Sequence, residues 1–280
     1  MKNPILADSG PAISGMDASL PLAIVPHDET SRDTMQAAPE SCCAPANRLL
    51  AALPEADYQR LAPHLQPAFL HAGQVLFSSN APGHGILFPS DGMVSVVLSS
   101  ADGSEVETIP IGREGMVGRV AFILGDTPTF RQAMVQASGC GWRLPLEAVK
   151  KECEQGGSLC ALLRDYLENL LITAGLIAVC KRRHQLEARL SHWLLFLSER
   201  MQLDDLPFGQ EMIADLIAAR ASEVTVASGL LWREKLIRFN HNSVTLLDRQ
   251  RLQRKACECS AILQSEQAQL FSNAAMRHAV

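Results

Sequence analysis

Cysteine and histidine are the residue types in this chain best suited to metal and redox chemistry, and the 280 residues hold eight of each. The cysteines lie at positions 42, 43, 140, 153, 160, 180, 257 and 259, and no two are separated by the two residues typical of zinc or thioredoxin-like motifs. His184 and His192 lie two helical turns apart, too far to share a metal without further ligands. The sequence therefore predicts no metal site, and reduced thiols are the expected state.

The cysteines are then expected to pack or to take part in redox chemistry. Cys160 and Cys180 fall on the apolar face of a predicted helix, where thiols behave as small apolar side chains. A redox switch through Cys42, Cys43 or the Cys257 and Cys259 pair stays an alternative.

Motifs for enzymatic chemistry are missing from the sequence. It has no Gly-x-Ser-x-Gly elbow, no phosphate loop of the Gly-x4-Gly-Lys type, no His-Glu-x-x-His and no dinucleotide fingerprint. We therefore expect a protein that is not an enzyme.

Charge is divided unequally along the chain. The formal net charge is -5, but residues 181–255 carry 13 Lys and Arg against 9 Asp and Glu, a net charge of +4, whereas residues 1–180 carry -8. A positive region on an acidic body is expected of a protein that meets nucleic acid through one face only.

The longest apolar stretch, residues 170–180, has 11 residues, short of the roughly 20 that span a bilayer. With no secretory signal at the start, we expect a cytoplasmic protein without membrane contact.

The elements that must position these residues follow from composition and periodicity. Six prolines within residues 1–46 predict a disordered tail. Two short helices are expected after Asn47, and the closely spaced apolar runs from Phe69 to Pro145, each ended by glycine or proline, predict an antiparallel roll. The expected division is a tail (1–46), a roll domain (47–156), a long helix (157–182), a DNA-binding domain (183–262) and a C-terminal tail (263–280).

The long helix has apolar residues at steps of three and four over about six turns. This spacing resembles a short coiled-coil seam and predicts a dimer interface, with burial against the helix's own domain as the alternative. The predicted interface residues are Leu159, Leu163, Tyr166, Leu170, Thr173 and Ile177.

Residues 206–247 have the order of a winged helix-turn-helix. A short helix, a tight break near Arg220 and a second helix reaching about Glu234, with Leu230 and Leu231 inward, are followed by a predicted hairpin over residues 236–246. The pattern favours DNA binding over the alternative of a helical subdomain with a hairpin. The expected fold class is α+β.

Several strings, together with this succession of roll, long helix and winged helix-turn-helix, resemble the Crp/Fnr family of bacterial transcription regulators over residues 47–260. The strings occupy residues 88–95, 112–118, 180–193, 224–227 and 256–259. The resemblance implies a cyclic-nucleotide-binding-like sensor domain and a homodimer along the long helix. It also implies RNA polymerase as a partner and a pseudo-palindromic, double-stranded DNA operator. The two recognition helices of the dimer would enter successive major grooves of that operator.

The same resemblance gives candidate effector contacts at Gly118, Arg131 and Gln132. Cyclic-AMP-binding members have a glutamate in the phosphate cassette, and the matching segment here has none. Cyclic AMP is therefore not expected, and another nucleotide effector, or none, stays open. An iron–sulfur cluster of the Fnr kind is not expected either, because Cys42 and Cys43 are adjacent and Cys140 is the only cysteine in the roll.

The recognition helix departs from the cyclic-AMP type, in which arginine, glutamate and a later arginine read the bases. Ala221, Ser222 and Val226 stand at those positions. We expect apolar contacts from Ala221, Thr225 and Val226 to thymine methyl groups, and polar contacts from Ser222. The full set of expected DNA contacts adds Arg220 at the turn, for which a surface salt bridge is the alternative, and Glu223, which could instead cap the helix. It also includes the phosphate contacts Arg233, Lys235 and Arg238.

The sequence thus predicts a homodimeric, sequence-specific transcription regulator in which the roll senses a signal and controls the spacing of the recognition helices. The alternative is a dimeric signalling adaptor that uses the C-terminal domain for protein contacts.

Overall fold

A computed structural model describes residues 46–77, 85–99, 105–118 and 131–278 of the chain. The predicted N-terminal tail lies outside the described residues except for residue 46, as does the segment 119–130. Among the described helices, none combines the length and apolar character that a bilayer crossing requires.

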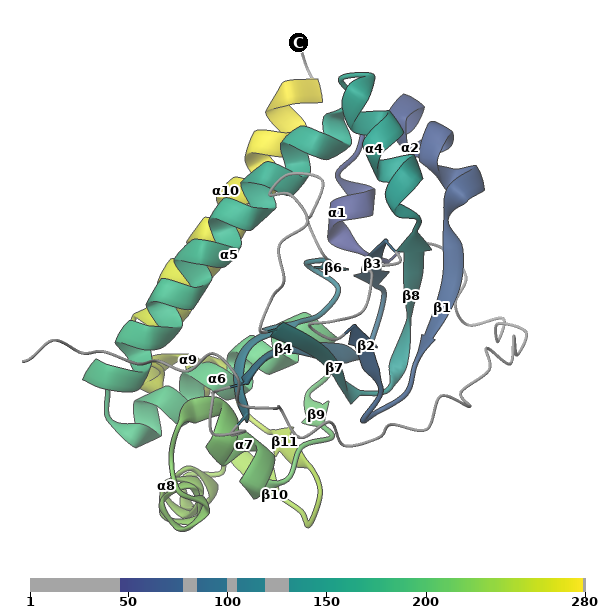
Figure 1. Cartoon of the computed structure of the whole chain (residues 1–280). Coiled ribbons are helices and arrows are strands. Elements are labelled where there is room, and N and C mark those ends of the chain that lie inside the picture. Colours follow the sequence, from purple (N-terminus) through teal and green to yellow (C-terminus); the bar gives the residue numbers. More distant parts are fainter. Residues whose placement is uncertain (1–45, 78–84, 100–104, 119–130, 279–280) are drawn as a thin grey trace, which may run out of the picture. The chain divides into compact units, whose positions relative to one another are not determined.

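Antiparallel strands build the first domain, as predicted. Four of them form a sheet in the order β1-β8-β3-β6 and four form a second sheet in the order β2-β7-β4-β5. The strands are β1 Gln66–Leu70, β2 Val75–Phe77, β3 Ile86–Pro89, β4 Met93–Ser99, β5 Glu105–Ile111, β6 Val117–Gly118, β7 Arg131–Ala137 and β8 Gly139–Leu144. Both sheets contribute to one buried cluster, with Leu70 and Leu87 from the first and Val94 and Val135 from the second. The two sheets therefore pack face to face as a β-roll (Figure 1).

Helices flank the roll and build the second domain. They are α1 Arg48–Ala51, α2 Glu55–Leu61, the 3-10 helix η2 Ala62–His64, α4 Leu146–Glu154, α5 Ser158–Arg183, α6 Leu186–Met201, α7 Gln210–Ile217, α8 Ala221–Arg233, α9 Arg249–Lys255 and α10 Cys259–His278. The pair α1 and α2 confirms the two short helices expected after Asn47, and α5 confirms the long helix to within one residue at each end. Helix α4 was not identified from the sequence.

Helix α5 belongs to two hydrophobic cores. Leu159, Leu163 and Tyr166 in its first half are buried with Phe88 of β3 and with residues of α1 and α2. Ile177 in its second half is buried in the core of the C-terminal domain. The helix therefore joins the roll to the domain that follows it.

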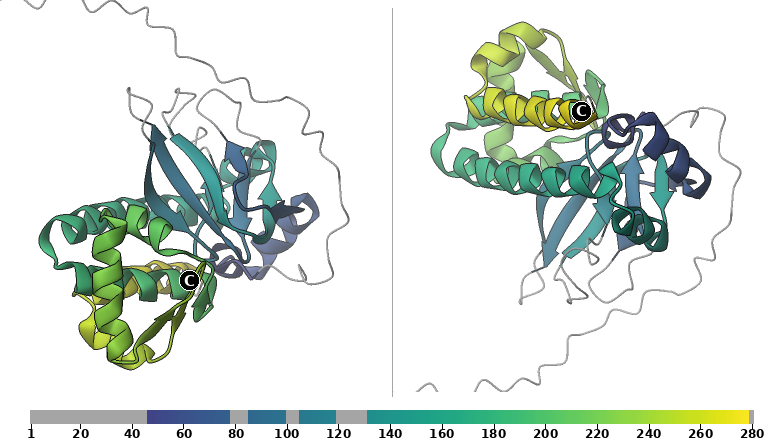
Figure 2. Two further views of the ribbon diagram at one scale, coloured as in Figure 1. Left: turned by 90° about the horizontal axis from the view of Figure 1, so that it is seen from below. Right: turned by 90° about the horizontal axis from the view of Figure 1, so that it is seen from above.

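The predicted C-terminal tail is instead most of helix α10, and this expectation was wrong. Helix α10 lies along α5 in the opposite direction (Figure 1 and Figure 2). Arg277 near its end forms an ion pair with Asp165 near the start of α5, while Cys259 at its start lies beside the end of α5. Leu270 and Ala274 are buried in the same core as the first half of α5, which explains why this segment is ordered as a helix.

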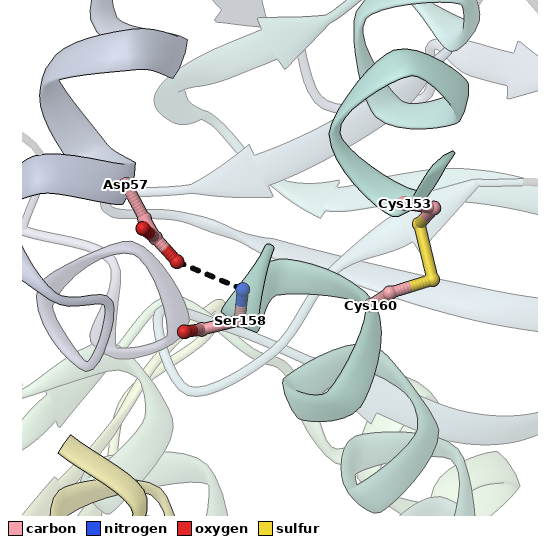
Figure 3. Close-up of a disulfide and its surroundings, with 4 residues drawn as sticks. All are labelled: Asp57, Cys153, Ser158 and Cys160. Atoms are coloured by element: carbon pink, nitrogen blue, oxygen red, sulfur yellow. Dashed lines mark hydrogen bonds between the residues drawn. A yellow bond between two sulfur atoms is a disulfide. The ribbon is translucent and has the colours of Figure 1, made fainter. Parts of the chain in front are cut away.

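The expectation of reduced thiols was wrong for Cys153 and Cys160, which form a disulfide (Figure 3). The chain turns at Gly156 and Gly157 between α4 and α5, and this turn brings the two Cα atoms within 5.2 Å. Beside it, the Asp57 carboxylate accepts a hydrogen bond of 2.8 Å from the backbone N–H of Ser158, the first residue of α5 (Figure 3). Cys160 is therefore a crosslink between two helices and not a small apolar side chain.

A buried ion pair joins α6 to the loop between β5 and β6. The Arg200 Nε lies 3.0 Å from Glu114 Oε1 and donates to the carbonyl oxygen of Pro110 at 3.1 Å. The Arg200 guanidinium also lies 3.5 Å from the ring centroid of Phe196. Gly112 permits this approach, because a Cβ at that position would lie 2.7 Å from the Arg200 carbonyl oxygen. Close packing against α6 therefore explains the glycine at position 112 in the segment 112–118.

We predict that Arg200→Met lowers the free energy of unfolding by about 3–5 kcal/mol, because Glu114 would remain buried without its partner. Adding Glu114→Gln to the same chain is expected to recover part of this loss. Urea unfolding followed by circular dichroism measures both changes.

The matched control is Arg277→Met, which removes an arginine from a more exposed ion pair with Asp165. Its expected effect is below about 1 kcal/mol. A loss in Arg200→Met no larger than that of the control would contradict a role for the buried pair.

Candidate nucleic-acid interface

Two short helices meet at a tight turn in the C-terminal domain, as predicted. Helix α7 ends at Ile217 and is capped by Ala218, whose φ of 52° lies in the left-handed region and reverses the chain. Helix α8 begins three residues later, at Ala221. Buried apolar residues hold the pair together, with Ile213 and Leu216 on α7 facing a core that also contains Val224 and Leu231 of α8. One face of α8 is therefore fixed in the core and the opposite face is exposed.

The exposed face of α8 contains the residues predicted to contact bases. Ala221, Ser222, Thr225 and Val226 are all exposed, and the Val226 side chain is 68% exposed. Leu230, predicted to point inward, is instead 42% exposed, while Leu231 is fully buried. The helical period allows only one of two adjacent leucines to face the core, and the sequence alone did not decide which.

Trp232, which the sequence analysis did not single out, is 60% exposed near the end of the same helix. An exposed tryptophan is uncommon, and its position seven residues after Thr225 would have placed it near this face.

Arg220 and Glu223 form an ion pair at the start of α8. Glu223 Oε1 accepts from the Arg220 guanidinium at 2.9 Å, and Glu223 Oε2 accepts from the Arg220 backbone N–H at 2.9 Å. These hydrogen bonds lower the pKa of Glu223 to about 2 and raise the pKa of Arg220. Glu223 therefore takes the capping role that the sequence left open. The Arg220 side chain is still 81% exposed, with donors left over for another acceptor.

Thr225 is held by a neighbour on α7. Its hydroxyl lies 2.8 Å from Gln210 Oε1 and 3.0 Å from the Ala221 carbonyl oxygen. These contacts leave the Thr225 methyl group as its contribution to the exposed face.

A small antiparallel sheet follows α8 and confirms the predicted wing. Strand β10 Ile237–Phe239 pairs with β11 Val244–Leu246, and β9 Asp205–Leu206, which was not predicted, adds a third strand.

Three cations are exposed around the end of α8 and the wing: Arg233, Lys235 and Arg238. None of the three forms an ion pair with a described residue. In contrast, Lys255 on α9 is paired with Glu187 and Glu234. These three unpaired cations thus lie at the end of α8, just after it, and on β10.

The residues predicted to form the dimer interface are mostly buried within the single chain. Five are at most 5% exposed: Leu159, Leu163, Tyr166, Thr173 and Ile177. Leu170 is half-buried and packs against the same core as the first half of α5. This geometry favours the alternative of burial against the chain itself. The exposed apolar side chains of α5 lie on a different face, at Leu171, Ile172 and Val179.

The predicted effector contacts are described only in part. Gly118 ends the short strand β6 and pairs with Ile86, and Gln132 is half-buried in β7 opposite Val97. The side chain of Arg131 and the intervening segment lie outside the described residues. Cys42 and Cys43 also lie outside them.

Comparison with protein families matches both domains. A cyclic nucleotide-binding domain matches residues 67–155, and a Crp-like helix-turn-helix domain matches residues 188–255. The chain belongs to the Crp/Fnr family of transcription regulators. Members of this family are DNA-binding regulators and not enzymes, so the winged helix-turn-helix of this Crp/Fnr protein is a DNA-binding domain.

Solved structures share the fold of this Crp/Fnr protein at low sequence identity. FixK2 from Bradyrhizobium japonicum has a TM-score of 0.58 at 14% identity, covering 69% of this chain and 98% of its own. The c-di-GMP-responsive regulator CLP of Xanthomonas campestris has a TM-score of 0.55 at 14% identity, covering 69% and 99%. A CRP-family transcriptional regulator from Thermus thermophilus has a TM-score of 0.52 at 19% identity, covering 68% and 96%. No curated protein matches the chain significantly.

Proposed function

We propose that the chain is a homodimeric, sequence-specific regulator whose helix α8 enters the major groove of an operator. The observation that carries this proposal is the exposed face of α8, bordered by the unpaired cations Arg233, Lys235 and Arg238. Unpaired cations bind phosphates without first breaking an ion pair, whereas the paired Lys255 would have to break two. This region also carries the +4 charge of residues 181–255.

Base recognition rests on small and apolar groups. Ala221, the Thr225 methyl group and Val226 suit the methyl group of thymine, and the Ser222 hydroxyl suits either kind of base edge. Arg220, at the start of α8, has the only guanidinium among these residues and suits guanine. We therefore infer half-sites that combine thymine with one guanine.

We predict that Arg220→Ala weakens binding to the operator by about 1–3 kcal/mol and relaxes specificity at one position, as expected for loss of a base contact. Helix α8 should remain intact, because the Glu223 cap also uses the Arg220 backbone N–H, which alanine retains. Fluorescence anisotropy at fixed salt, with an operator selected from genomic fragments, measures the change.

Arg238→Gln provides the comparison, since Arg238 lies on the wing and is assigned to phosphate. It should weaken binding to all sequences alike and reduce the slope of log affinity against log salt by about 1 for each protomer, or about 2 for the dimer. Lys151→Ala, on α4, should change neither quantity. Equal operator affinity of Arg220→Ala and the unmodified protein would remove Arg220 from the interface.

A second copy of the chain is the proposed partner along α5. Leu171, Ile172, Gly175 and Val179 are exposed on one side of this helix, and Gly175 lies four residues after Leu171 and four before Val179. Leu171 is 74% exposed, which is costly for a leucine in water. Gly175, with no atom within 4 Å of where its Cβ would be, leaves room for the close approach of another helix. We propose this stripe as the dimer seam, in place of the predicted residues.

We predict that the double variant Leu171→Glu and Val179→Glu is monomeric at concentrations where the unmodified chain is dimeric. Each glutamate would have to be buried opposite its own symmetry mate, which is strongly unfavourable. Size-exclusion chromatography with light scattering measures the mass. Val106→Glu, at an exposed valine of the roll, is the control and should stay dimeric. A dimeric double variant with unchanged helix content would place the interface elsewhere.

Signal sensing by the roll is the remaining part of the proposal. CLP, one of the similar structures, is described as c-di-GMP-responsive, so a cyclic dinucleotide is a reasonable candidate effector for this chain. An effector that favours one arrangement of α5 would change the distance between the two recognition helices and thereby the affinity for the operator. The regulator bound at the promoter would then contact RNA polymerase.

We expect cyclic AMP and cyclic GMP to leave the unfolding midpoint unchanged, because the phosphate cassette lacks its glutamate. A thermal-shift screen with cyclic mononucleotides and dinucleotides measures this, since a ligand of the folded state raises the midpoint. A midpoint rise with micromolar cyclic AMP would contradict the expectation.

The alternative, a dimeric adaptor with a protein-binding C-terminal domain, is favoured by the apolar side chains of α8, especially Leu230 and Trp232. Salt separates the two functions. DNA affinity falls steeply as salt rises, whereas binding to an apolar surface does not.

A further inference from the structure

Four potential metal ligands converge where the long helix ends. Cys180 lies in the last turn of α5 and His184 caps that helix, while Cys257 and Cys259 lie between α9 and the start of α10. Their donor atoms all lie within 4.8 Å of one another. Residues separated by more than 70 positions in the sequence are thus brought to one point.

Two of the separations within this cluster match the edges of one tetrahedral site. Zinc binds cysteine sulfur at about 2.3 Å and histidine nitrogen at about 2.0–2.1 Å, so the edges of a tetrahedral site measure about 3.5–3.8 Å. The Cys180 and Cys257 sulfurs are 3.5 Å apart, and the Cys259 sulfur is 3.6 Å from His184 Nδ1. The coordination sphere would be closed by four protein ligands, as in structural zinc sites.

The histidine is oriented as a metal ligand would be. Its Nδ1 faces Cys259, and its Nε2 lies 3.0 Å from Glu258 Oε1. Histidines that bind metals commonly donate their other ring N–H to a carboxylate, which fixes the ring and the tautomer. Glu258 lies between Cys257 and Cys259. The segment 257–259 therefore supplies two of the four proposed ligands and also the carboxylate that contacts His184.

Burial and charge are also suitable. Cys180, Cys257 and Cys259 are at most 8% exposed and are free thiols, with no disulfide among the three. Three thiolates and one neutral imidazole around Zn²⁺ carry a net charge of -1. Lys181, Arg182 and Arg183, adjacent to two of the ligands, would offset that charge.

We propose that Cys180, His184, Cys257 and Cys259 bind one structural zinc ion. Sulfur-rich tetrahedral sites favour zinc among the common divalent ions, and four donor atoms within 4.8 Å of one another leave room for one ion and not for two. The ion fastens the end of α5 to the start of α10. It does so independently of the DNA-binding proposal, because none of the ligands lies on α8 or the wing.

The test uses the full chain purified without chelator. We expect about one zinc per chain by inductively coupled plasma mass spectrometry, and none in Cys257→Ser with Cys259→Ser. The matched control, Cys153→Ser with Cys160→Ser, also removes two cysteines but leaves this cluster unchanged, so it should retain the zinc. Glu258→Gln should weaken zinc affinity by about 10–100-fold in a competition with a chromophoric chelator.

Cobalt substitution of the unmodified protein keeps the test valid if the cysteine variant fails to fold. Cobalt bound here should show the intense visible bands of tetrahedral coordination and charge-transfer bands from thiolate. Absence of zinc together with absence of these bands would overturn the proposal. A disulfide between any two of the three cysteines, found by mass spectrometry of alkylated, non-reduced protein, would also overturn it and would assign the cluster to redox chemistry.

Discussion

Burial of helix α5 by two different cores is the constraint on which the rest of the structure depends. A helix of 26 residues has room for more than one apolar stripe, and this one uses two sides. The helix packs on the roll through Leu159, Leu163 and Tyr166, and on the DNA-binding domain through Ile177. One side of α5 is therefore buried within the chain itself. Helix α10 adds Leu270 and Ala274 to the same core. Only the side with Leu171 and Val179 remains for another molecule.

A helix shared by two cores also couples them. A shift of α5 relative to the roll would have to move the C-terminal core that contains Ile177, because close-packed side chains transmit displacement. The buried pair of Arg200 and Glu114 forms a second connection, from α6 to the loop before β6. That loop leads directly to Gly118, one of the predicted effector contacts. A ligand bound there would thus act close to a charged contact with the helix that packs on α8.

Local patterns were sufficient for much of the fold. Glycine and proline at the ends of apolar runs predicted the antiparallel roll, and the periodicity around Val224 and Leu231 predicted the recognition helix. The sequence failed where the outcome depends on distant segments. It could not show that α10 covers one side of α5, so it could not separate a dimer interface from burial within the chain. It also could not bring Cys180 to Cys257, 77 residues away, because the spacing rules for metal ligands describe only local pairs.

Both of these points depend on helix α10. Its packing along α5 explains why the predicted seam is buried, and the proposed zinc at its first turn explains how that packing is held at one end. The other end is held by the ion pair of Arg277 and Asp165, which is partly exposed and therefore weak. If zinc binds as proposed, the strongest attachment lies where α5 meets α6. The direction in which α6 leaves α5 is then fixed, and motion of the DNA-binding domain must come from α5 as a whole.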